Sequence, residues 1–253
     1  MDEYISLCHQ GEKYAQDSKD YINAGHIVEK LIHSYVARKE NKKVRECISR
    51  LRKYHKHPDS STLGLINFSQ SELYRIEKRY PAALKSISKA LSFWRIEENY
   101  RSISFGLYKL AELQQIAKNF NAARQSYLEA IKISLSSHNY DYLCANTNGL
   151  AKLELNEQNW LVAERTAKIA LTVAEKIRNH LEASISCRCI GIALLKQNKH
   201  QRALRYARRA ISLLSNYRNL DLSDTESLVV ECEQAIQSKH LNKQTKAKKK
   251  KYK

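Results

Sequence analysis

The sequence predicts an all-α fold in which helix hairpins repeat along the chain. Two ladders of residues, one of aromatic and alanine positions and one of asparagines, keep the same period of 40 residues. Such self-similarity is the signature of a repeat array. Only six glycines and two prolines interrupt the 253 residues, which favours helices joined by short turns. We therefore expect one solenoid rather than separate globular domains.

The first ladder is clearest in the stretch from Asn119 to Ala130. Its members there are Phe120, Ala123, Tyr127 and Ala130, at offsets of 0, +3, +7 and +10. This spacing places the four side chains on one face of an α-helix, so each copy contains a helix with a buried stripe. The other copies of the stripe are Tyr80, Ala83, Ile87 and Ala90; Trp160, Ala163, Ala167 and Ala170; His200, Ala203, Ala207 and Ala210.

A second apolar run precedes each of these helices, so each copy is a pair of helices. In the copy that contains Phe120 this run includes Leu107, Leu110 and Ala111. Polar turns such as Lys118-Asn119 join the pair, and asparagine suits the left-handed residue that ends a helix. We expect the second ladder to end helices between copies in the same way; its members are Asn99, Asn139, Asn179 and Asn219.

These hairpins resemble the tetratricopeptide repeat over about residues 61–220. The resemblance rests on a small residue in the first helix, such as Ala111, an aromatic residue that opens the second helix, and alanines three and ten residues later. The usual unit has about 34 residues, so this chain is more similar to the long-helix variants of kinesin light chain and of bacterial peptide-sensing regulators. The resemblance implies a right-handed superhelical solenoid whose concave groove binds peptides or partner proteins, without catalysis or cofactor. In the first copy Gln70 and Ser71 replace the expected Leu-Gly or Leu-Ala, and we expect that helix to pack less closely.

Residues 1–57 are less regular. We expect helices over Tyr4–Gln16, Tyr21–Lys39 and Lys42–Tyr54, the last as a degenerate second helix of a repeat. The stretch His57-Pro58-Asp59-Ser60 then breaks the chain, and Asp59 or Ser60 is suited to cap the next helix.

The four predicted repeats occupy residues 58–220. After them a helix within residues 221–238 is expected to cap the array. Residues 239–253 are expected to be disordered, because they have almost no apolar surface to bury. The approximate repeat boundaries are 61–100, 101–140, 141–180 and 181–220.

The net charge of +18 is concentrated in two segments. Arg38 to His57 holds nine Lys and Arg against two Glu, and Lys239 to Lys253 holds eight lysines without an acid. Because the array between them is close to neutral, we expect no nucleic acid in its groove. The lysine tail suits RNA, an anionic membrane surface or another polyanion, or is simply solvated. The candidate tail residues are Lys246, Lys248, Lys249, Lys250, Lys251 and Lys253.

The sequence offers no pattern for metal binding or catalysis. The six cysteines include no Cys-x-x-Cys pair, and we interpret them as reduced core residues of a cytosolic or nuclear chain. No two glycines lie closer than Gly11 and Gly25, which excludes a glycine-rich phosphate loop. No run of about 18 apolar residues suggests a membrane span. We therefore expect no catalytic residue, metal or cofactor.

The candidate binding residues lie on the first helix of each hairpin, on the face turned away from the second helix. We expect a peptide with an apolar segment near Phe68, Phe105 and Tyr108 and an acidic group near Lys152 and Arg188. The alternative is that some of these aromatic side chains only pack between repeats. The candidate groove residues are Phe68, Glu72, Arg75, Phe105, Tyr108, Glu112, Gln115, Asn148, Lys152 and Arg188.

Overall fold

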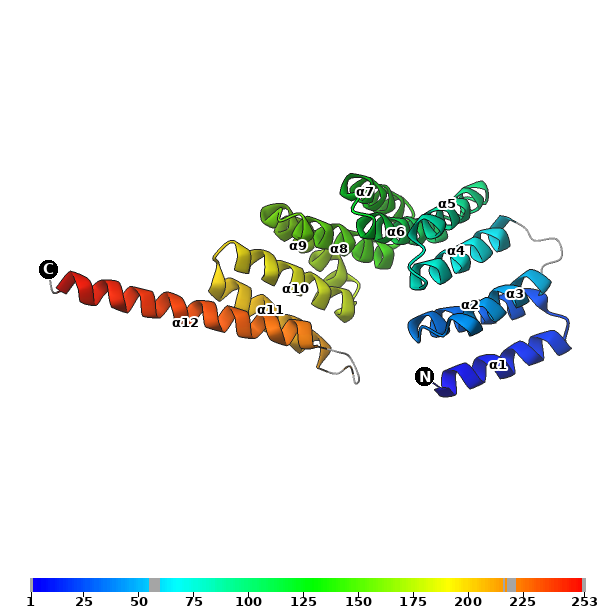
Figure 1. The fold of residues 1–253 in the computed structure, drawn as a ribbon, viewed down its shortest axis with the longest axis horizontal. Coiled ribbons are helices and arrows are strands. Elements are labelled where there is room, and N and C mark those ends of the chain that lie inside the picture. Colours follow the sequence, from blue (N-terminus) through cyan, green and yellow to red (C-terminus); the bar gives the residue numbers. More distant parts are fainter. Residues whose placement is uncertain (1, 55–59, 216, 218–221, 252–253) are drawn as a thin grey trace. The chain divides into compact units, whose positions relative to one another are not determined.

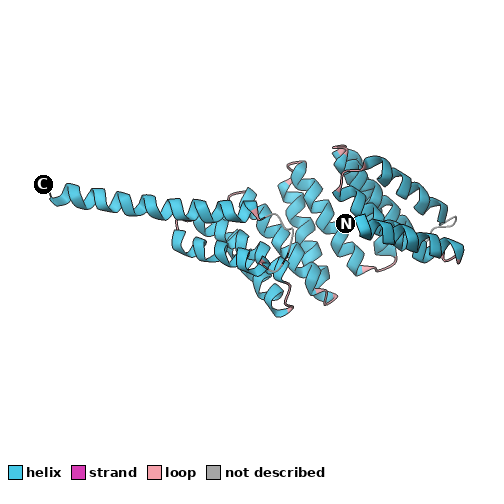
Figure 2. Cartoon of the chain, turned by 90° about the horizontal axis from the view of Figure 1, so that it is seen from below, coloured by secondary structure: helices cyan, strands magenta, loops and turns pink. Residues whose placement is uncertain are grey.

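The computed structural model describes residues 2–54, 60–215, 217 and 222–251, and its regular secondary structure is entirely helical (Figure 2). The predicted all-α fold is thus confirmed over these residues. The helices are α1 (Asp2–Asp17), α2 (Tyr21–Ala37), α3 (Asn41–Tyr54), α4 (Ser60–Ile76), α5 (Tyr80–Ile96), α6 (Tyr100–Ile116), α7 (Phe120–Ser136), α8 (Tyr140–Asn156), α9 (Trp160–Lys176), α10 (His180–Lys196), α11 (His200–Leu214) and α12 (Ser223–Lys251).

The backbone repeats every 20 residues, which is half the period seen in the sequence. Each helix from α4 to α10 has 17 residues. The connections between them each contain one left-handed residue, and these residues recur every 20 positions from Lys78 to Asn198. At Lys118 the helix ends in paired bonds, since Lys118 N donates to Gln115 O (2.9 Å) and Asn119 N donates to Gln114 O (2.8 Å). Connections within and between hairpins are therefore alike.

The asparagines of the second ladder lie at the starts of helices and not at their ends. The sequence prediction that they end helices was therefore wrong. Asn99 has a φ of −74° and its Oδ1 accepts from Ser102 N at 3.1 Å. Asn139 and Asn179 cap α8 and α10 in the same way. The left-handed residue is the one before each asparagine, and it is Glu98 in the first case. An asparagine side chain satisfies a free amide of the first helical turn, which explains the ladder. Asn219 lies outside the described residues.

The chain divides into two compact units, residues 1–133 (unit 1) and 134–253 (unit 2). In unit 1, α1 packs on α2, α2 on α3 and α4, α3 on α4, α4 on α5, and α5 on α6 (Figure 1). In unit 2, α8 packs on α9 and α10, α10 packs on α9, α11 and α12, and α11 packs on α12. Contact with the next helix and the next but one is the pattern of a helical solenoid.

The predicted stripe of small residues is buried in both units. Ala123, Tyr127 and Ala130 are at most 1% exposed, and the corresponding alanines of α9 and α11 are completely buried. A further ladder, which the sequence analysis did not single out, joins each first helix to its own second helix. Ser104 Oγ donates to Ala130 O (3.4 Å), and Cys144 and Ser184 make the equivalent bonds to Ala170 and Ala210.

Trp94 of α5 fills the core of unit 1 between two glycines. A Cβ on Gly106 would lie 2.8 Å from Trp94 Cζ3, and a Cβ on Gly64 would approach the indole more closely still. Both glycines are therefore required by the close approach of one aromatic ring. In α4, Ser71 is buried and donates from Oγ to Ala83 O at 2.9 Å, so this helix packs closely on α5, contrary to the expectation from its sequence.

The ends of the chain agree only partly with the sequence prediction. The three amino-terminal helices lie where they were expected, whereas the predicted chain break at 57–59 falls outside the described residues. The structure continues α12 as one helix to Lys251, although residues 239–253 were expected to be disordered (Figure 1). Lysine, alanine and glutamine are all favourable in helices. Within the described residues no helix is long and apolar enough to cross a membrane.

Candidate functional site

The first helices of unit 2, α8 and α10, carry a half-buried strip that combines apolar and basic residues. Leu155, Ile192 and Leu195 are partly buried and pack against the core of the unit. Lys152 and Arg188, which the sequence predicted to bind an acidic group, are also partly exposed. We call these five residues the unit 2 strip.

Arg188 is held at the strip by an exposed partner. Its Nη1 donates to Asp224 Oδ2 of α12 at 3.1 Å, and the Asp224 side chain is 82% exposed. An ion pair of this exposure contributes little to stability.

Asn148, predicted on the same face, is only 1% exposed. Its Nδ2 donates to Glu182 O (3.1 Å) and Glu182 Oε2 (2.7 Å), and its Oδ1 accepts from Ser186 Oγ (2.8 Å). These bonds join α8 to α10 and leave the amide inaccessible. Asn148 therefore holds successive repeats together, and a ligand lying on the surface does not reach it.

In unit 1 two of the predicted residues are also interior. Phe68 is 2% exposed and its ring lies 5.3 Å from that of Phe105 and 5.9 Å from that of Trp94, centre to centre. Glu72 is buried. Its carboxylate accepts from Arg75 Nη2 at 2.8 Å and from Arg75 Nε at 3.1 and 3.2 Å. These contacts match the alternative that some of the predicted residues pack between repeats.

The predicted residues of α6 remain partly exposed. Lys109 Nζ lies 5.5 Å from the ring centre of Tyr108 and donates to Glu112 Oε2 at 2.9 Å. Gln115 donates to the hydroxyl of Tyr127 at 2.8 Å, and burial raises the pKa of that tyrosine. The exposed face of α6 is thus accessible, but its polar side chains already interact with other residues of unit 1.

A cavity of about 380 Å³ in unit 1 was missed by the sequence analysis. It lies among the amino-terminal halves of α2 and α4 and the start of α6. Lys19 and Lys39 have positive φ and frame α2 with the same left-handed connections as the later helices. The lining residues of the cavity are Ile22, Gly25, His26, Glu29, Ser61, Thr62, Leu65, Trp94, Asn99 and Ser102.

An arginine cleft of about 360 Å³ lies between α3 and the end of α4. Arg45 and Arg79 both pair with Glu77, and Arg52 donates to Gln70 Oε1 at 3.2 Å. Three guanidinium groups line the cleft and two of them pair with its one lining carboxylate, Glu77. The excess of positive charge suits an anion. The basic segment predicted from Arg38 to His57 contributes two of these arginines.

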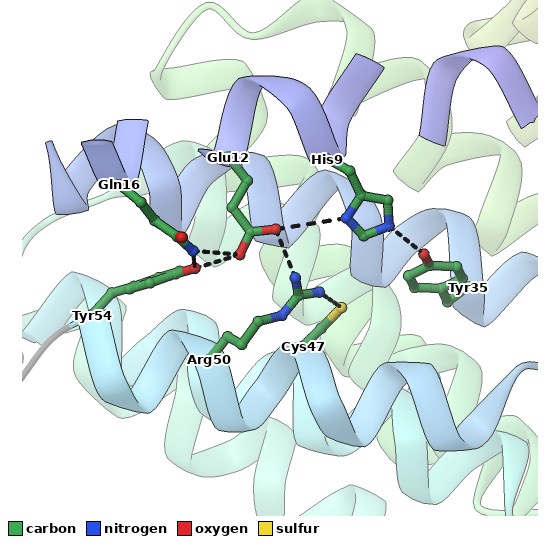
Figure 3. Close-up of polar contacts among 7 residues, drawn as sticks. All are labelled: His9, Glu12, Gln16, Tyr35, Cys47, Arg50 and Tyr54. Atoms are coloured by element: carbon green, nitrogen blue, oxygen red, sulfur yellow. Dashed lines mark hydrogen bonds and ion pairs between the residues drawn. The ribbon is translucent and has the colours of Figure 1, made fainter. Parts of the chain in front are cut away.

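A polar network joins α1 to α2 and α3 (Figure 3). The buried carboxylate of Glu12 accepts from Arg50 Nη1 at 2.7 Å and from the hydroxyl of Tyr54. Burial and the neighbouring Glu12 raise the pKa of Tyr54 to about 12. On the same helix His9 contacts the hydroxyl of Tyr35 at 2.8 Å. The network fixes the orientation of α1.

All six cysteines are buried, as the sequence predicted. Burial raises the pKa of Cys144 to about 12 and those of Cys187 and Cys232 to about 11. A buried thiol of high pKa is a poor nucleophile and a poor metal ligand. In the described part of the chain no three His, Cys, Asp or Glu side chains group as a metal site.

Comparisons with solved structures identify the fold. BtubC (BKLC) from P. vanneervenii is 17% identical over 87% of this chain and 93% of its own, with a TM-score of 0.67. A STAND signal-transduction ATPase with a tetratricopeptide repeat sensor, from Pyrococcus horikoshii, is 16% identical with a TM-score of 0.72 over 93% of this chain; the match spans only 36% of that protein. No family model matches the sequence, and no curated protein matches it.

A third similar structure is a peptide complex. NprR bound to its cognate peptide NprX is 14% identical over 96% of this chain and 74% of its own, with a TM-score of 0.60. At such identities the similarity shows the fold alone, and that fold is the helical solenoid of tetratricopeptide-repeat proteins, as the sequence predicted.

Proposed function

We propose that this chain, with its tetratricopeptide-repeat fold, is a protein-interaction adaptor that binds a peptide segment of a partner protein on the first-helix face of its array. The unit 2 strip is the surface that we assign to this role. It binds without catalysis or cofactor. The occurrence of a peptide complex in a protein of the same fold supports this class of function.

The observation that carries the proposal is the composition of the strip. Three apolar side chains, Leu155, Ile192 and Leu195, are only half covered by their own core. They offer apolar surface to a ligand, while Lys152 and Arg188 offer charged hydrogen bonds to a carboxylate. The ligand that fits is a peptide with an apolar side chain and a nearby acidic residue.

The test is a double charge reversal, Lys152→Glu with Arg188→Glu, in an affinity purification of partner proteins. The matched control is Arg165→Glu with Lys176→Glu, which makes the same change of charge on exposed positions of α9. We expect the strip variant to lose partners that the native chain and the control retain. Equal recovery by a strip variant with a native circular dichroism spectrum would remove this surface from consideration.

A second candidate function is polyanion binding, and the arginine cleft favours it. Arg45 and Arg79 pair there with Glu77, and Arg52 lines the same cleft. The lysine tail adds further charge in sequence. RNA or anionic vesicles are the probes. Binding that falls steeply between low and moderate salt, and is lost on deletion of residues 239–253 or in Arg45→Glu with Arg52→Glu, would support this function. Binding unaffected by salt would contradict it.

A further inference from the structure

The cavity among α2, α4 and α6 combines a carboxylate with apolar walls. Glu29 of α2 is its one acidic lining residue, and among the described residues no lysine or arginine lines it. Ile22 and Leu65 supply apolar surface, and Ile22 is 67% exposed. A volume of about 380 Å³ lies at the small end of the range of ligand pockets in proteins. The cavity is therefore large enough for one side chain of another molecule.

The carboxylate of Glu29 has no strong cationic partner within unit 1. It lies 3.9 Å from His26 Nδ1 and 3.8 Å from His33 Nε2, and it pairs with no lysine or arginine that the structure describes. Glu72 of α4 and Glu112 of α6, by contrast, each pair with a cation of their own helix. The Glu29 side chain is 35% exposed. A cation from another molecule can therefore reach this carboxylate.

The indole of Trp94 lines the same cavity from α5. Trp94 is only 4% exposed, yet its N–H donates to no residue in the described part of the chain. A Cβ on Gly64 would lie closer to Nε1 than to any other ring atom, which places the N–H at the α4 wall of the cavity, near Leu65. Nearly buried polar groups usually have a hydrogen-bond partner. The indole N–H is thus free to donate to an acceptor inside the cavity.

The helix ends beside the cavity do not reverse its negative charge. Free amides at the start of a helix attract anions. In α2 the side chain of Asp20 accepts from Asn23 N at 3.1 Å, and in α6 the side chain of Asn99 accepts from Ser102 N at 3.1 Å. These caps occupy amides of both helices, and Asp20 adds a further negative charge. The cavity therefore favours a cation.

We propose that this cavity binds the side chain of a lysine or arginine residue in a peptide segment of a partner protein. The cationic head donates to Glu29, and the aliphatic stem lies against Ile22 and Leu65. The backbone carbonyl of the bound residue accepts from the N–H of Trp94. Such long side chains are held by charged hydrogen bonds at the head and by apolar contact along the stem. The site goes beyond the role of the unit 2 strip, which was assigned a peptide with an acidic residue.

The test is a titration of the full chain with two capped tripeptides, alanine-lysine-alanine and alanine-norleucine-alanine, at about pH 7.5, where histidine carries little charge. Norleucine keeps the four-carbon stem and lacks the ammonium group. The readout is the indole N–H signal of Trp94 in the nitrogen-15 NMR spectrum. Trp160→Phe leaves Trp94 as the one tryptophan and copies the equivalent Phe120.

We expect the lysine peptide to shift the Trp94 signal downfield in a saturable way, because the N–H gains a hydrogen bond. The norleucine peptide should cause little shift. Absence of a saturable shift with the lysine peptide, or an equal shift with the norleucine peptide, would overturn the proposal.

Two variants test the assigned contacts. Glu29→Gln removes the charge at nearly constant size and should weaken binding of the lysine peptide about tenfold or more. The matched control is Glu46→Gln, the same change at an exposed position of α3, which should bind as the native chain does. Ser61→Leu fills the cavity without changing its charge and should abolish binding with a native circular dichroism spectrum. Native affinity in Glu29→Gln, or in a folded Ser61→Leu chain, would contradict the site.

Butylamine distinguishes a peptide residue from a free amine. It has the same ammonium group and stem as lysine but no carbonyl, so we expect weaker binding and little shift of the Trp94 signal. Equal affinity and an equal shift would refute the peptide contact. The Lys152→Glu with Arg188→Glu variant should bind the lysine peptide normally, so this site and the unit 2 strip can fail separately.

Discussion

The two units keep the same backbone spacing with different core residues. In unit 1 the ring of Trp94 packs near Phe68, and Gly64 and Gly106 lie where the ring approaches the neighbouring helices. Both units bury alanines on their second helices, and unit 2 adds cysteines such as Cys144 and Cys187 on its first helices. The 20-residue stride is therefore set by the connections, each with its left-handed residue, and the core is free to vary within it.

The largest expected loss of stability comes from placing a charge in the small-residue core of unit 2. Ala167→Arg forces a long cation into a fully buried helix contact and should lower the free energy of unfolding by about 4 kcal/mol. Ile169→Arg, on the exposed side of the same helix, should change it by about 0.5 kcal/mol or less. Urea denaturation measures both. Similar values for the two variants would show that α9 does not pack closely.

Replacing a helix glycine by alanine should change the free energy of unfolding by a smaller amount, and this amount should differ between the units. Gly64→Ala pushes Trp94 from its site and should cost about 2 kcal/mol. Gly191→Ala places its Cβ 3.1 Å from the movable Leu228 Cδ2, so the gain in helix propensity offsets the contact and the net change should be about 0.5 kcal/mol or less.

A double variant shows whether the indole is the cause. In a Trp94→Leu background the cost of Gly64→Ala should largely disappear, which urea denaturation of the four chains measures as a coupling energy. An equal cost in both backgrounds would mean that Gly64 is needed for another reason.

Most of the fold could be predicted from the sequence because the repeated residues have simple physical roles. Ala123 and Ala163 are buried where helices approach closely, and their spacing fixes the helix face. The asparagine ladder was found, but its role was misassigned. Asparagine is favoured both at the left-handed residue after a helix and at the cap before one, and only the backbone of Asn99 and Glu98 distinguishes the two.

The candidate site was less predictable, because helix periodicity says which face a residue is on but not how close the next helix lies. The same helix periodicity places Asn148 and Lys152 on one face of α8. Asn148 is nevertheless buried, because it is bonded to α10. Phe68 is likewise covered because a tryptophan fills the space beside it. Such contacts depend on residues 26 to 38 positions away, which no local pattern contains.

The caps should have equal effects in both units. Asn99→Ala in unit 1 and Asn179→Ala in unit 2 each remove one bond to the first turn of a helix, at 3.1 Å in both cases. Each should cost about 1 kcal/mol in the free energy of unfolding. Asn159 makes no cap bond and donates instead to Glu154 Oε2 at 2.7 Å, so its change to alanine tests that bond and not a cap. A marked difference between Asn99 and Asn179 would contradict a common stride set by the connections.

The effect that is smallest near neutral pH is an alkaline destabilisation that arises from the cysteines of unit 2. Burial raises the pKa of Cys144 from its usual 9.0 to about 12, so the folded chain keeps a proton that the unfolded chain loses. The stability from this difference is fully present below pH 9.0 and is lost as the pH rises from there towards 12. Cys144→Ser copies Ser104 and Ser184 of the same ladder and removes the titration. Thermal denaturation should therefore show a shallower fall in Tm above pH 9 for this variant, whereas an unchanged slope would assign the fall to other groups.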